Sequence, residues 1–289
     1  MTTTTATVPP AGPPAAAPKA PALPPAKGKA GLAGALASEW TKLRTLRSTF
    51  WTLLALVVIS VGLAAGVSAG SASELNSHPK DVAGFDATQT PLFIFLLLGP
   101  LVIALLGSLV ITSEYSTGMI RTSLTVQPRR GVVYAAKAIV FTVVALVVCV
   151  VISFAAFFVG QMLLSSAGAS VTLSHTHTVR AIIGSALYVT TAGLFAFAVG
   201  AILRHTAGAI AVSVAVLFVV QILVNFLPAS WHDHVIRWLP SSSWQQLSST
   251  MGTQTQTHLF GIWPQFGVTA GYAVVLLIIG AYLFKKRDA

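Results

Sequence analysis

Acidic residues are scarce in this chain of 289 residues: only 7 are Asp or Glu, and charged residues of both signs make up 8% of the sequence. A soluble domain carries about a quarter charged residues, so this composition excludes an ordinary water-soluble fold. Cysteine is nearly absent as well. Cys149 stands alone, which excludes an intrachain disulfide.

Signatures of catalysis are also missing. The sequence has no Gly-x-x-x-x-Gly-Lys-Ser/Thr phosphate loop, so it cannot build an ATP site of that kind, and we expect no cofactor in this chain. The apolar runs lack the Gly-x-Ser-Gly, paired-glutamate and His-Glu-x-x-His patterns of intramembrane enzymes, so we expect no catalytic residue and no metal site. The net charge of +10 comes without a groove-reading or RNA-binding motif, and nucleic acid is therefore not an expected partner.

Long hydrophobic runs are abundant. Hydrophobic residues make up 55% of the chain and the mean hydropathy is +0.81. Six runs reach the roughly 20 residues that are needed to cross a bilayer core. They predict an all-α integral membrane protein with six transmembrane helices in one permease domain, residues 35–289, at about 50–70, 91–112, 134–164, 181–203, 208–227 and 265–284.

Two segments precede the first span. Residues 1–34 are rich in Pro and Ala and have no acidic residue, which predicts a disordered tail. In residues 35–48, apolar side chains recur at helical spacing and basic side chains occupy the other faces. This pattern predicts an amphipathic helix in the membrane interface, with Trp40 as its aromatic anchor. A cytoplasmic extension of the first span is the alternative. The polar and anchoring residues of the interface helix are Glu39, Trp40, Lys42, Arg44 and Arg47.

Lys and Arg predict the orientation. Fourteen of the 17 fall in the N-terminal segment, the loop between the second and third spans, the turn at Arg204 and the C-terminal tail. Only Lys80, Arg180 and Arg237 fall on the other side. The positive-inside rule then places both termini in the cytoplasm of a multi-pass protein of the cell membrane.

The loop between the second and third spans carries the most distinctive pattern. Glu114 stands where a short helix would begin, and Gly118 and Pro128 flank the aliphatic stretch 120–126. Such a helix suits a loop that receives a push from a soluble motor, although an ordinary positive-inside loop remains the alternative. The candidate residues for coupling to a motor subunit are Glu114, Tyr115, Gly118, Met119, Arg121, Pro128, Arg129 and Arg130.

The segment from Glu114 to Lys137 resembles the intracellular loop of type-two ATP-binding cassette exporter permeases. An acidic residue, a glycine, an aliphatic stretch, a proline, basic residues and a lysine follow in the family's order, while Met119 replaces the usual Thr. The segments 38–49, 204–208 and 285–289 are similar to the actinobacterial branch of that family. The resemblance spans about residues 35–289.

The resemblance implies a function. Permeases of this family pair as homodimers or heterodimers around a pathway, and each docks on a separate nucleotide-binding ATPase subunit that binds ATP and Mg. It implies export, with drugs, lipids, peptide antibiotics or glycans as possible cargo, and multidrug resistance as one expected consequence. Glu114 is then expected to be the main docking residue. A secondary transporter or channel that works without an ATPase is the alternative function.

The long connection between the fifth and sixth spans is rich in tryptophan. Trp238, Pro240 and Trp244 lie in it, as an interfacial belt or, by the resemblance, in re-entrant helices that narrow an outer gate. Six histidines also fall on the outer side, two of them spaced His-x-His, which could bind a metal, although solvated loop histidines are the favoured interpretation. They are His78, His175, His177, His232, His234 and His258.

Overall fold

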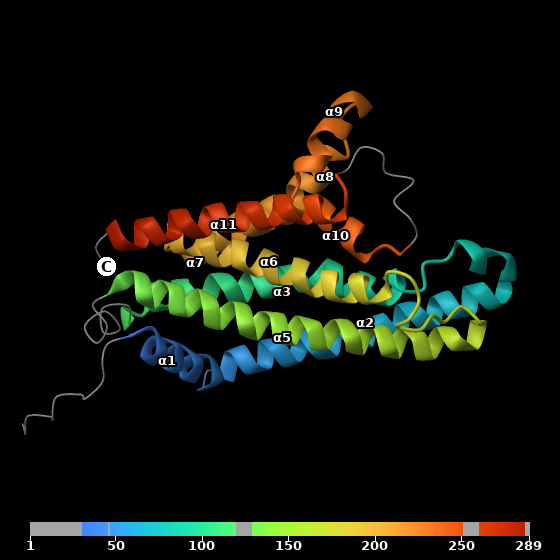
Figure 1. Ribbon diagram of the computed structural model, residues 1–289, viewed down its shortest axis with the longest axis horizontal. Helices are drawn as coiled ribbons and strands as arrows, with labels where there is room; N and C mark the ends of the chain where they lie inside the picture. Colours follow the sequence, from blue (N-terminus) through green and yellow to red (C-terminus); the bar gives the residue numbers. More distant parts are fainter. Residues whose placement is uncertain (1–30, 46, 120–128, 251–259, 287–289) are drawn as a thin grey trace, which may run out of the picture.

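The computed structural model describes residues 31–45, 47–119, 129–250 and 260–286. Within these ranges every regular element is helical, and six helices are long and apolar enough to cross a membrane. This confirms the predicted all-α integral membrane fold. The long helices lie side by side in an elongated bundle, with α1 and the C-terminal end of α11 at the same end, which we call the α1 end (Figure 1). The opposite end is the distal end.

The described part of the chain contains long helices, one divided span and several short elements. The interface helix is α1 (Leu32–Thr45), and the unbroken long helices are α2 (Arg47–Ser77), α3 (Gln89–Ser116), α5 (Arg130–Leu164), α6 (Thr178–Leu203) and α11 (Ile262–Lys286). The fifth span is divided into α7 (Thr206–Val214), the π-helical η3 (Ala215–Val219) and α8 (Val220–Val224). The short elements are η1 (Pro79–Gly84), η2 (Ser165–Ala167), α9 (Ala229–Val235), η4 (Ile236–Trp238) and α10 (Ser242–Ser248).

Several predicted boundaries are wrong. The first span does not end near residue 70, because its Ser- and Ala-rich continuation meets no helix breaker before Pro79, and α2 runs on to Ser77. The interface helix is shifted: residues 32–34 belong to α1 rather than to a disordered tail, and Arg47 is the first residue of α2. The rest of the predicted tail, residues 1–30, lies outside the described residues.

Helix α6 occupies the centre of the bundle. Most of its residues are buried, and it packs against α3, α5, α7, α10 and α11. Small residues along it let neighbouring backbones approach closely. The closest approach is to α3, where a Cβ on Gly107 would overlap the carbonyl oxygen of Gly193.

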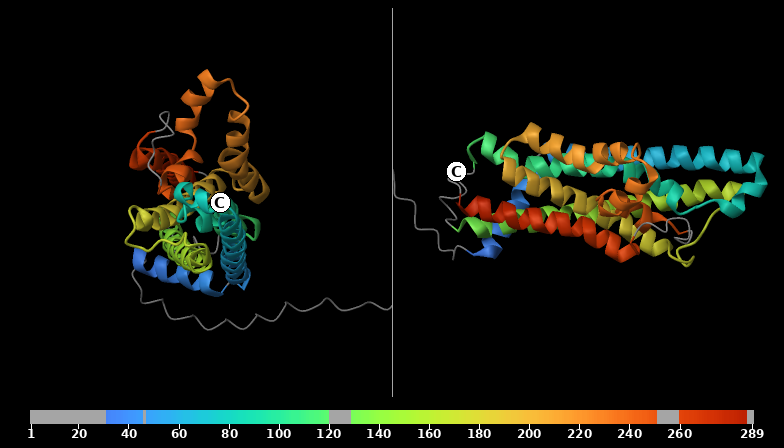
Figure 2. Two further views of the ribbon diagram at one scale, coloured as in Figure 1. Left: turned by 90° about the vertical axis from the view of Figure 1, so that its right-hand side faces the viewer. Right: turned by 90° about the horizontal axis from the view of Figure 1, so that it is seen from above.

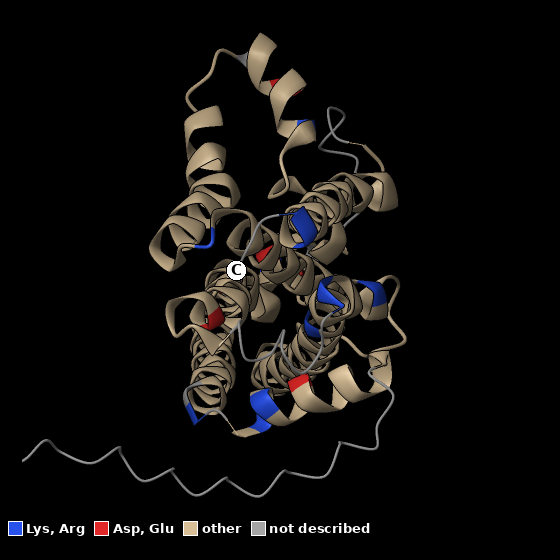
Figure 3. Cartoon of the chain, turned by 90° about the vertical axis from the view of Figure 1, so that its left-hand side faces the viewer, with Lys and Arg blue, Asp and Glu red and all other residues tan. Residues whose placement is uncertain are grey.

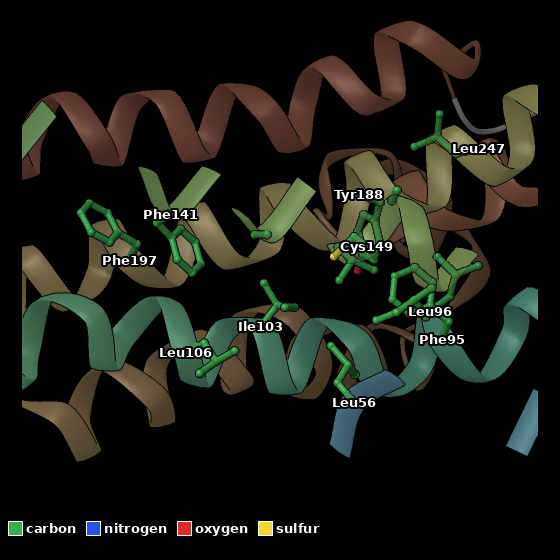
Figure 4. Packing of buried hydrophobic residues seen from close by; sticks show 14 of the residues in the cluster. Leu56, Phe95, Leu96, Ile103, Leu106, Phe141, Cys149, Tyr188, Phe197 and Leu247 are labelled. Carbon is green, nitrogen blue, oxygen red and sulfur yellow. The ribbon is translucent and has the colours of Figure 1, made fainter. Parts of the chain in front are cut away.

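The core follows α6 along its length. Near the α1 end, the rings of Phe141 and Phe197 stack with centroids 6.0 Å apart, and Tyr134 packs against Phe197 and Phe284. Towards the distal end the same cluster continues through Cys149 and Tyr188 (Figure 4). This continuous apolar contact holds α3, α5 and α6 as one body.

The outer faces of the bundle are apolar. Large hydrophobic side chains stay exposed along α2, α5 and α11, among them Val58, Val147 and Ile278. In water such a surface would drive aggregation, whereas in a bilayer it meets lipid chains of the same polarity. The exposed faces therefore belong in the membrane.

The last part of the fifth span leaves the bundle. The predicted helix 208–227 is wrong at its end, because residues 225–227 form a turn after α8. Helices α8 and α9 then project away from the other helices (Figures 1 and 2). The chain returns through η4 to α10, which packs on α6 and α11.

Candidate functional site

Four charged side chains meet inside the α1 end of the bundle. Glu39 and Lys42 come from α1, Glu114 from the last turn of α3, and Lys137 from about two turns inside α5. Viewed from this end, α1 lies across the bundle and carries acidic and basic positions next to each other (Figure 3). We call these four residues the charge cluster.

The two lysines each bridge the two glutamates. Lys42 Nζ lies 2.8 Å from Glu39 Oε1 and 2.8 Å from Glu114 Oε1. Lys137 Nζ lies 2.6 Å from Glu39 Oε2 and 2.9 Å from Glu114 Oε1. The cluster therefore joins three helices through four ion pairs, and α1 is connected both to α3 and to α5.

The packing of α1 explains why a glutamate points inward. Residues three apart share a face of a helix, so Glu39 and Lys42 lie on one side of α1. That side faces the bundle, since α1 packs chiefly on α5. Glu39 is 5% exposed, whereas the adjacent Trp40 is 50% exposed on another side.

Charge balance makes this burial tolerable. An unpaired charge inside a protein costs several kcal/mol, but here two carboxylates meet two ammonium groups. Burial alone lowers the pKa of Lys42, yet its hydrogen bonds to Glu114 and Glu39, with their negative charges, outweigh burial and raise that pKa. Removing any one member would leave one uncompensated charge among the other three.

One oxygen of the cluster is not used. Glu114 Oε1 accepts both lysine ammonium groups, whereas Glu114 Oε2 is buried and has no hydrogen-bond partner among the described residues. The side chain lines a pocket of about 370 Å³ between α1, α2 and α3. Polar and apolar groups thus meet at the α1 end.

The predicted coupling residues surround this cluster where they are described. The half-buried ring of Tyr115 packs against Phe284 and under the guanidinium of Arg204, 4.8 Å from the ring centroid. Gly118 has a φ of +71°, a left-handed conformation that suits glycine just after α3. Met119 is exposed and lines the pocket.

The other end of the same loop enters α5. Arg129 precedes the helix and is exposed, and Arg130 is its first residue. Arg121, Pro128 and the predicted loop helix at 120–126 lie outside the described residues. The expectation that Glu114 docks directly on a partner does not suit its position, because Glu114 is 6% exposed and bonded within the chain. Its coupling role stays a prediction.

The remaining interface residues face outward. Trp40 is exposed, as expected for an anchor in the membrane interface, and Arg44 is exposed near the end of α1. Arg47 is exposed and belongs to α2, not to the interface helix, because α1 ends at Thr45. The ion-paired Glu39 and Lys42 lie on the side of α1 that packs on the bundle.

The predicted gate residues lie at the distal end in three different settings. Trp238 is exposed and contacts the ring of Phe260, with centroids 5.3 Å apart. Pro240 is buried, and its carbonyl accepts a hydrogen bond from Thr269 of α11 at 2.8 Å. Trp244 of α10 is half-buried against Phe93 of α3. The structure does not bring these three side chains together.

A buried glutamine holds α10 in place. Gln265 of α11 is fully buried, and its Nε2 donates to the carbonyl oxygen of Arg237 and to Ser242 Oγ. Ser243 Oγ donates to the Gln265 carbonyl at 2.8 Å. Sequence reasoning missed this network, since a single Gln near a predicted span gives no sign of its partners.

Sequence reasoning also missed the cluster itself. The sequence places Lys137 with the basic residues at the start of the third span and Glu39 in the amphipathic interface helix, and their pairing joins positions 98 residues apart. The available signal was a lone lysine in an otherwise apolar stretch of α5, which needs a carboxylate partner if it is buried. For the histidines, the described residues contain no group of three or more His, Cys, Asp or Glu able to hold a metal, and His258 lies outside them.

Comparison with known proteins agrees with this architecture. The model of a family described as ABC-2 family transporter protein matches residues 36–289, which include the charge cluster and all six spans. No curated protein matches the chain. Because the matched region covers most of the sequence, this multi-pass membrane chain belongs to the ABC-2 family of transporter proteins, as the membrane subunit of an ABC transporter.

Proposed function

We propose that this chain is the membrane-spanning subunit of an ATP-driven exporter. It forms half of the translocation pathway beside a second permease chain, identical or related, and it docks on a separate nucleotide-binding subunit that binds ATP and Mg. Family membership supports the ATPase partner. The excess of Lys and Arg at the α1 end supports a cytoplasmic location for that end, where a soluble ATPase would dock.

The charge cluster is the observation that carries the proposal. It connects α1 to α3 and α5 beside the C-terminal end of α3, where the predicted coupling loop begins. A force applied to α1 or to this loop would therefore reach the ends of two spans together. Because a buried ion pair has a defined geometry and a large penalty for breaking, it transmits displacement better than exposed flexible side chains would.

The described part of the spans suggests the cargo class. Apart from the charge cluster, the charged residues of the six spans lie close to helix ends, and the interior is apolar with scattered hydroxyl and amide groups. Such an interior suits a hydrophobic or amphipathic compound better than a bare ion. Export of drugs, with multidrug resistance as its consequence, falls within this class of cargo. Membership in the actinobacterial branch stays a prediction, because the family match does not distinguish the branches.

The distal segment supports an outer gate. α10 lies against α3, α6 and α11, held by hydrogen bonds of Ser242 with Gln265 and of Ser243 with Thr269. A displacement of α3 or α11 would therefore carry α10 with it. In this scheme Trp238, Pro240 and Trp244 act through the position of α10, without direct contact among the three.

The test is coupled ATPase activity. The full chain is co-expressed with a candidate nucleotide-binding subunit, purified as a complex and reconstituted into vesicles, and ATP hydrolysis and export of candidate compounds are measured. Glu114→Ala should uncouple the two by lowering export more than hydrolysis, whereas Glu74→Ala, an exposed glutamate of α2, should match wild type. Wild-type coupling in Glu114→Ala, or export by the chain without any ATPase, would overturn the proposal.

A further inference from the structure

The pocket beside the charge cluster has the size and walls of a small-molecule site. Its volume of about 370 Å³ lies in the range of about 300–1,000 Å³ that such sites occupy. Aliphatic side chains form one part of its wall: Leu43 from α1 and Leu106, Leu109 and Val110 from α3. The charge cluster and five hydroxyl side chains form its polar part, so the pocket is amphipathic; the hydroxyls are those of Thr45, Thr49, Thr52, Ser113 and Thr117.

The polar part holds an unsatisfied acceptor. Glu114 Oε2 is buried without a hydrogen-bond partner among the described residues, although the other oxygen of the same carboxylate accepts two. Buried polar atoms in folded proteins are nearly always bonded, so an exception marks a place for a missing donor. Because the Glu114 side chain lines the pocket, a ligand bound there can supply that donor.

Charge balance selects a neutral ligand. Glu39 and Glu114 are matched by Lys42 and Lys137, so the polar part has no net charge. A cationic or anionic ligand would lose its hydration without gaining a net opposite charge. A neutral group that donates one hydrogen bond, such as a hydroxyl or an amide N–H, satisfies Oε2 without disturbing the four ion pairs.

We infer that this pocket binds a neutral amphiphile whose hydroxyl or amide donates to Glu114 Oε2 while its apolar part lies against Leu106, Leu109 and Val110. The ligand bridges α1 and α3 directly beside the charge cluster. This inference goes beyond the proposed function and does not rest on it, because the pocket is formed by the chain alone.

The binding test uses the purified full chain in nanodiscs of phosphatidylcholine, a lipid without a hydrogen-bond donor. The probe is dodecan-1-ol carrying a photoactivatable diazirine, and the labelled peptides are identified by mass spectrometry. Dodecan-1-ol should compete at a concentration about tenfold or more below that of its methyl ether, since a hydrogen bond to a charged group is lost in the ether. Dodecylamine and dodecanoate should also compete less well than the alcohol.

Two variants fill the pocket without touching the cluster. Val110→Trp and Leu109→Trp place an indole among the aliphatic wall residues, and Leu97→Trp, at an exposed position of the same helix, is the matched control. Labelling of α1 and α3 should fall about tenfold or more in a filled pocket and stay at the wild-type level in Leu97→Trp. Size-exclusion profiles show which variants are folded, and either folded filling variant suffices.

The source of the natural ligand is separated by a further arm. If a monoacylglycerol added to the nanodisc competes with the probe, the natural ligand is a membrane lipid. If only dodecan-1-ol competes, the natural ligand is a smaller amphiphile. Both results support the inference. Equal competition by dodecan-1-ol and its methyl ether would overturn it. So would labelling that persists in a folded filling variant.

Discussion

Glu39 and Lys137 are 98 residues apart in the sequence, and their charged atoms lie 2.6 Å apart in the interior of the α1 end. This pair connects the interface helix directly to α5. Both side chains are almost completely buried. If one of them is removed, bulk water cannot take its place as the partner of the other.

Removing one member of this pair should therefore be expensive. Glu39→Gln is expected to lower the free energy of unfolding by about 3–5 kcal/mol, because Lys137 keeps its charge without full compensation. Thermal unfolding of the detergent-solubilised protein measures the effect. Glu74→Gln, at an exposed site in α2, should change stability by less than about 0.5 kcal/mol.

The double variant Glu39→Gln/Lys137→Met refines this test. Residues in direct contact are not additive, so the double variant should be more stable than the sum of the two single losses predicts. Additive losses would show that the two residues act independently, against the geometry of the cluster.

Lys42 should keep its proton to unusually high pH. A folded-state pKa raised above the unfolded value stabilises the protein fully below the unfolded value, about 10.4, and the contribution is lost as pH rises through the folded pKa. Stability from this group should thus be constant from neutral pH to about pH 10 and fall above it. Amine-reactive esters at about pH 9 should label Lys42 more slowly than the exposed Lys80. Equal labelling rates would contradict this prediction.

The contact between α3 and α6 should not tolerate a methyl group. Gly107→Ala places a Cβ onto the carbonyl oxygen of Gly193, so we expect a loss of about 1–3 kcal/mol or more from forced separation of the two helices. Gly62→Ala in α2 is the matched control, since nothing lies within 4 Å of its Cβ position. Thermal midpoints of the two variants in one detergent give the comparison, and equal midpoints would refute the close approach.

At the distal end, Asp86 should stabilise both α3 and the segment after α10. Its Oδ1 accepts from the backbone N–H of Gln89 at 2.9 Å, and its Oδ2 accepts from the N–H of Thr250 at 2.8 Å. Asp86→Ala removes these acceptors and should cost about 0.5–2 kcal/mol, as loss of a helix cap does. Hydrogen exchange at Gln89 and Thr250 should accelerate, and Asp81→Ala at an exposed position should leave both unchanged.

Apolar runs were sufficient to predict the six spans, because lipid exposure requires helices whose side chains are apolar on nearly every face. The boundaries were less predictable. Polar Ser and Glu residues near the end of α2 lowered its apparent hydropathy, although nothing in them stops a helix before Pro79. The π-helical segment Ala215–Val219 contains no proline or glycine from which it could be predicted.

The candidate site was predicted in composition but not in arrangement. Glu39, Lys42 and Glu114 were each singled out as polar residues near the membrane interface, yet their meeting with Lys137 depends on how α1 crosses α5. Sequence spacing gives contacts within one helix, such as Glu39 with Lys42, and gives no information about contacts between helices far apart in the chain.

Coupling through the charge cluster is tested most directly by measuring a distance at the distal end while ATP binds to the ATPase subunit at the α1 end. Spin labels at Ser73 of α2 and Trp263 of α11, both exposed, report one distance in the reconstituted complex, and the buried Cys149 stays unlabelled. We predict that ATP shifts this distance in the complex with the ATPase subunit, and that Glu39→Gln abolishes the shift while hydrolysis continues. An undiminished shift in Glu39→Gln, or a shift on ATP addition to the chain without its ATPase, would contradict coupling through the charge cluster.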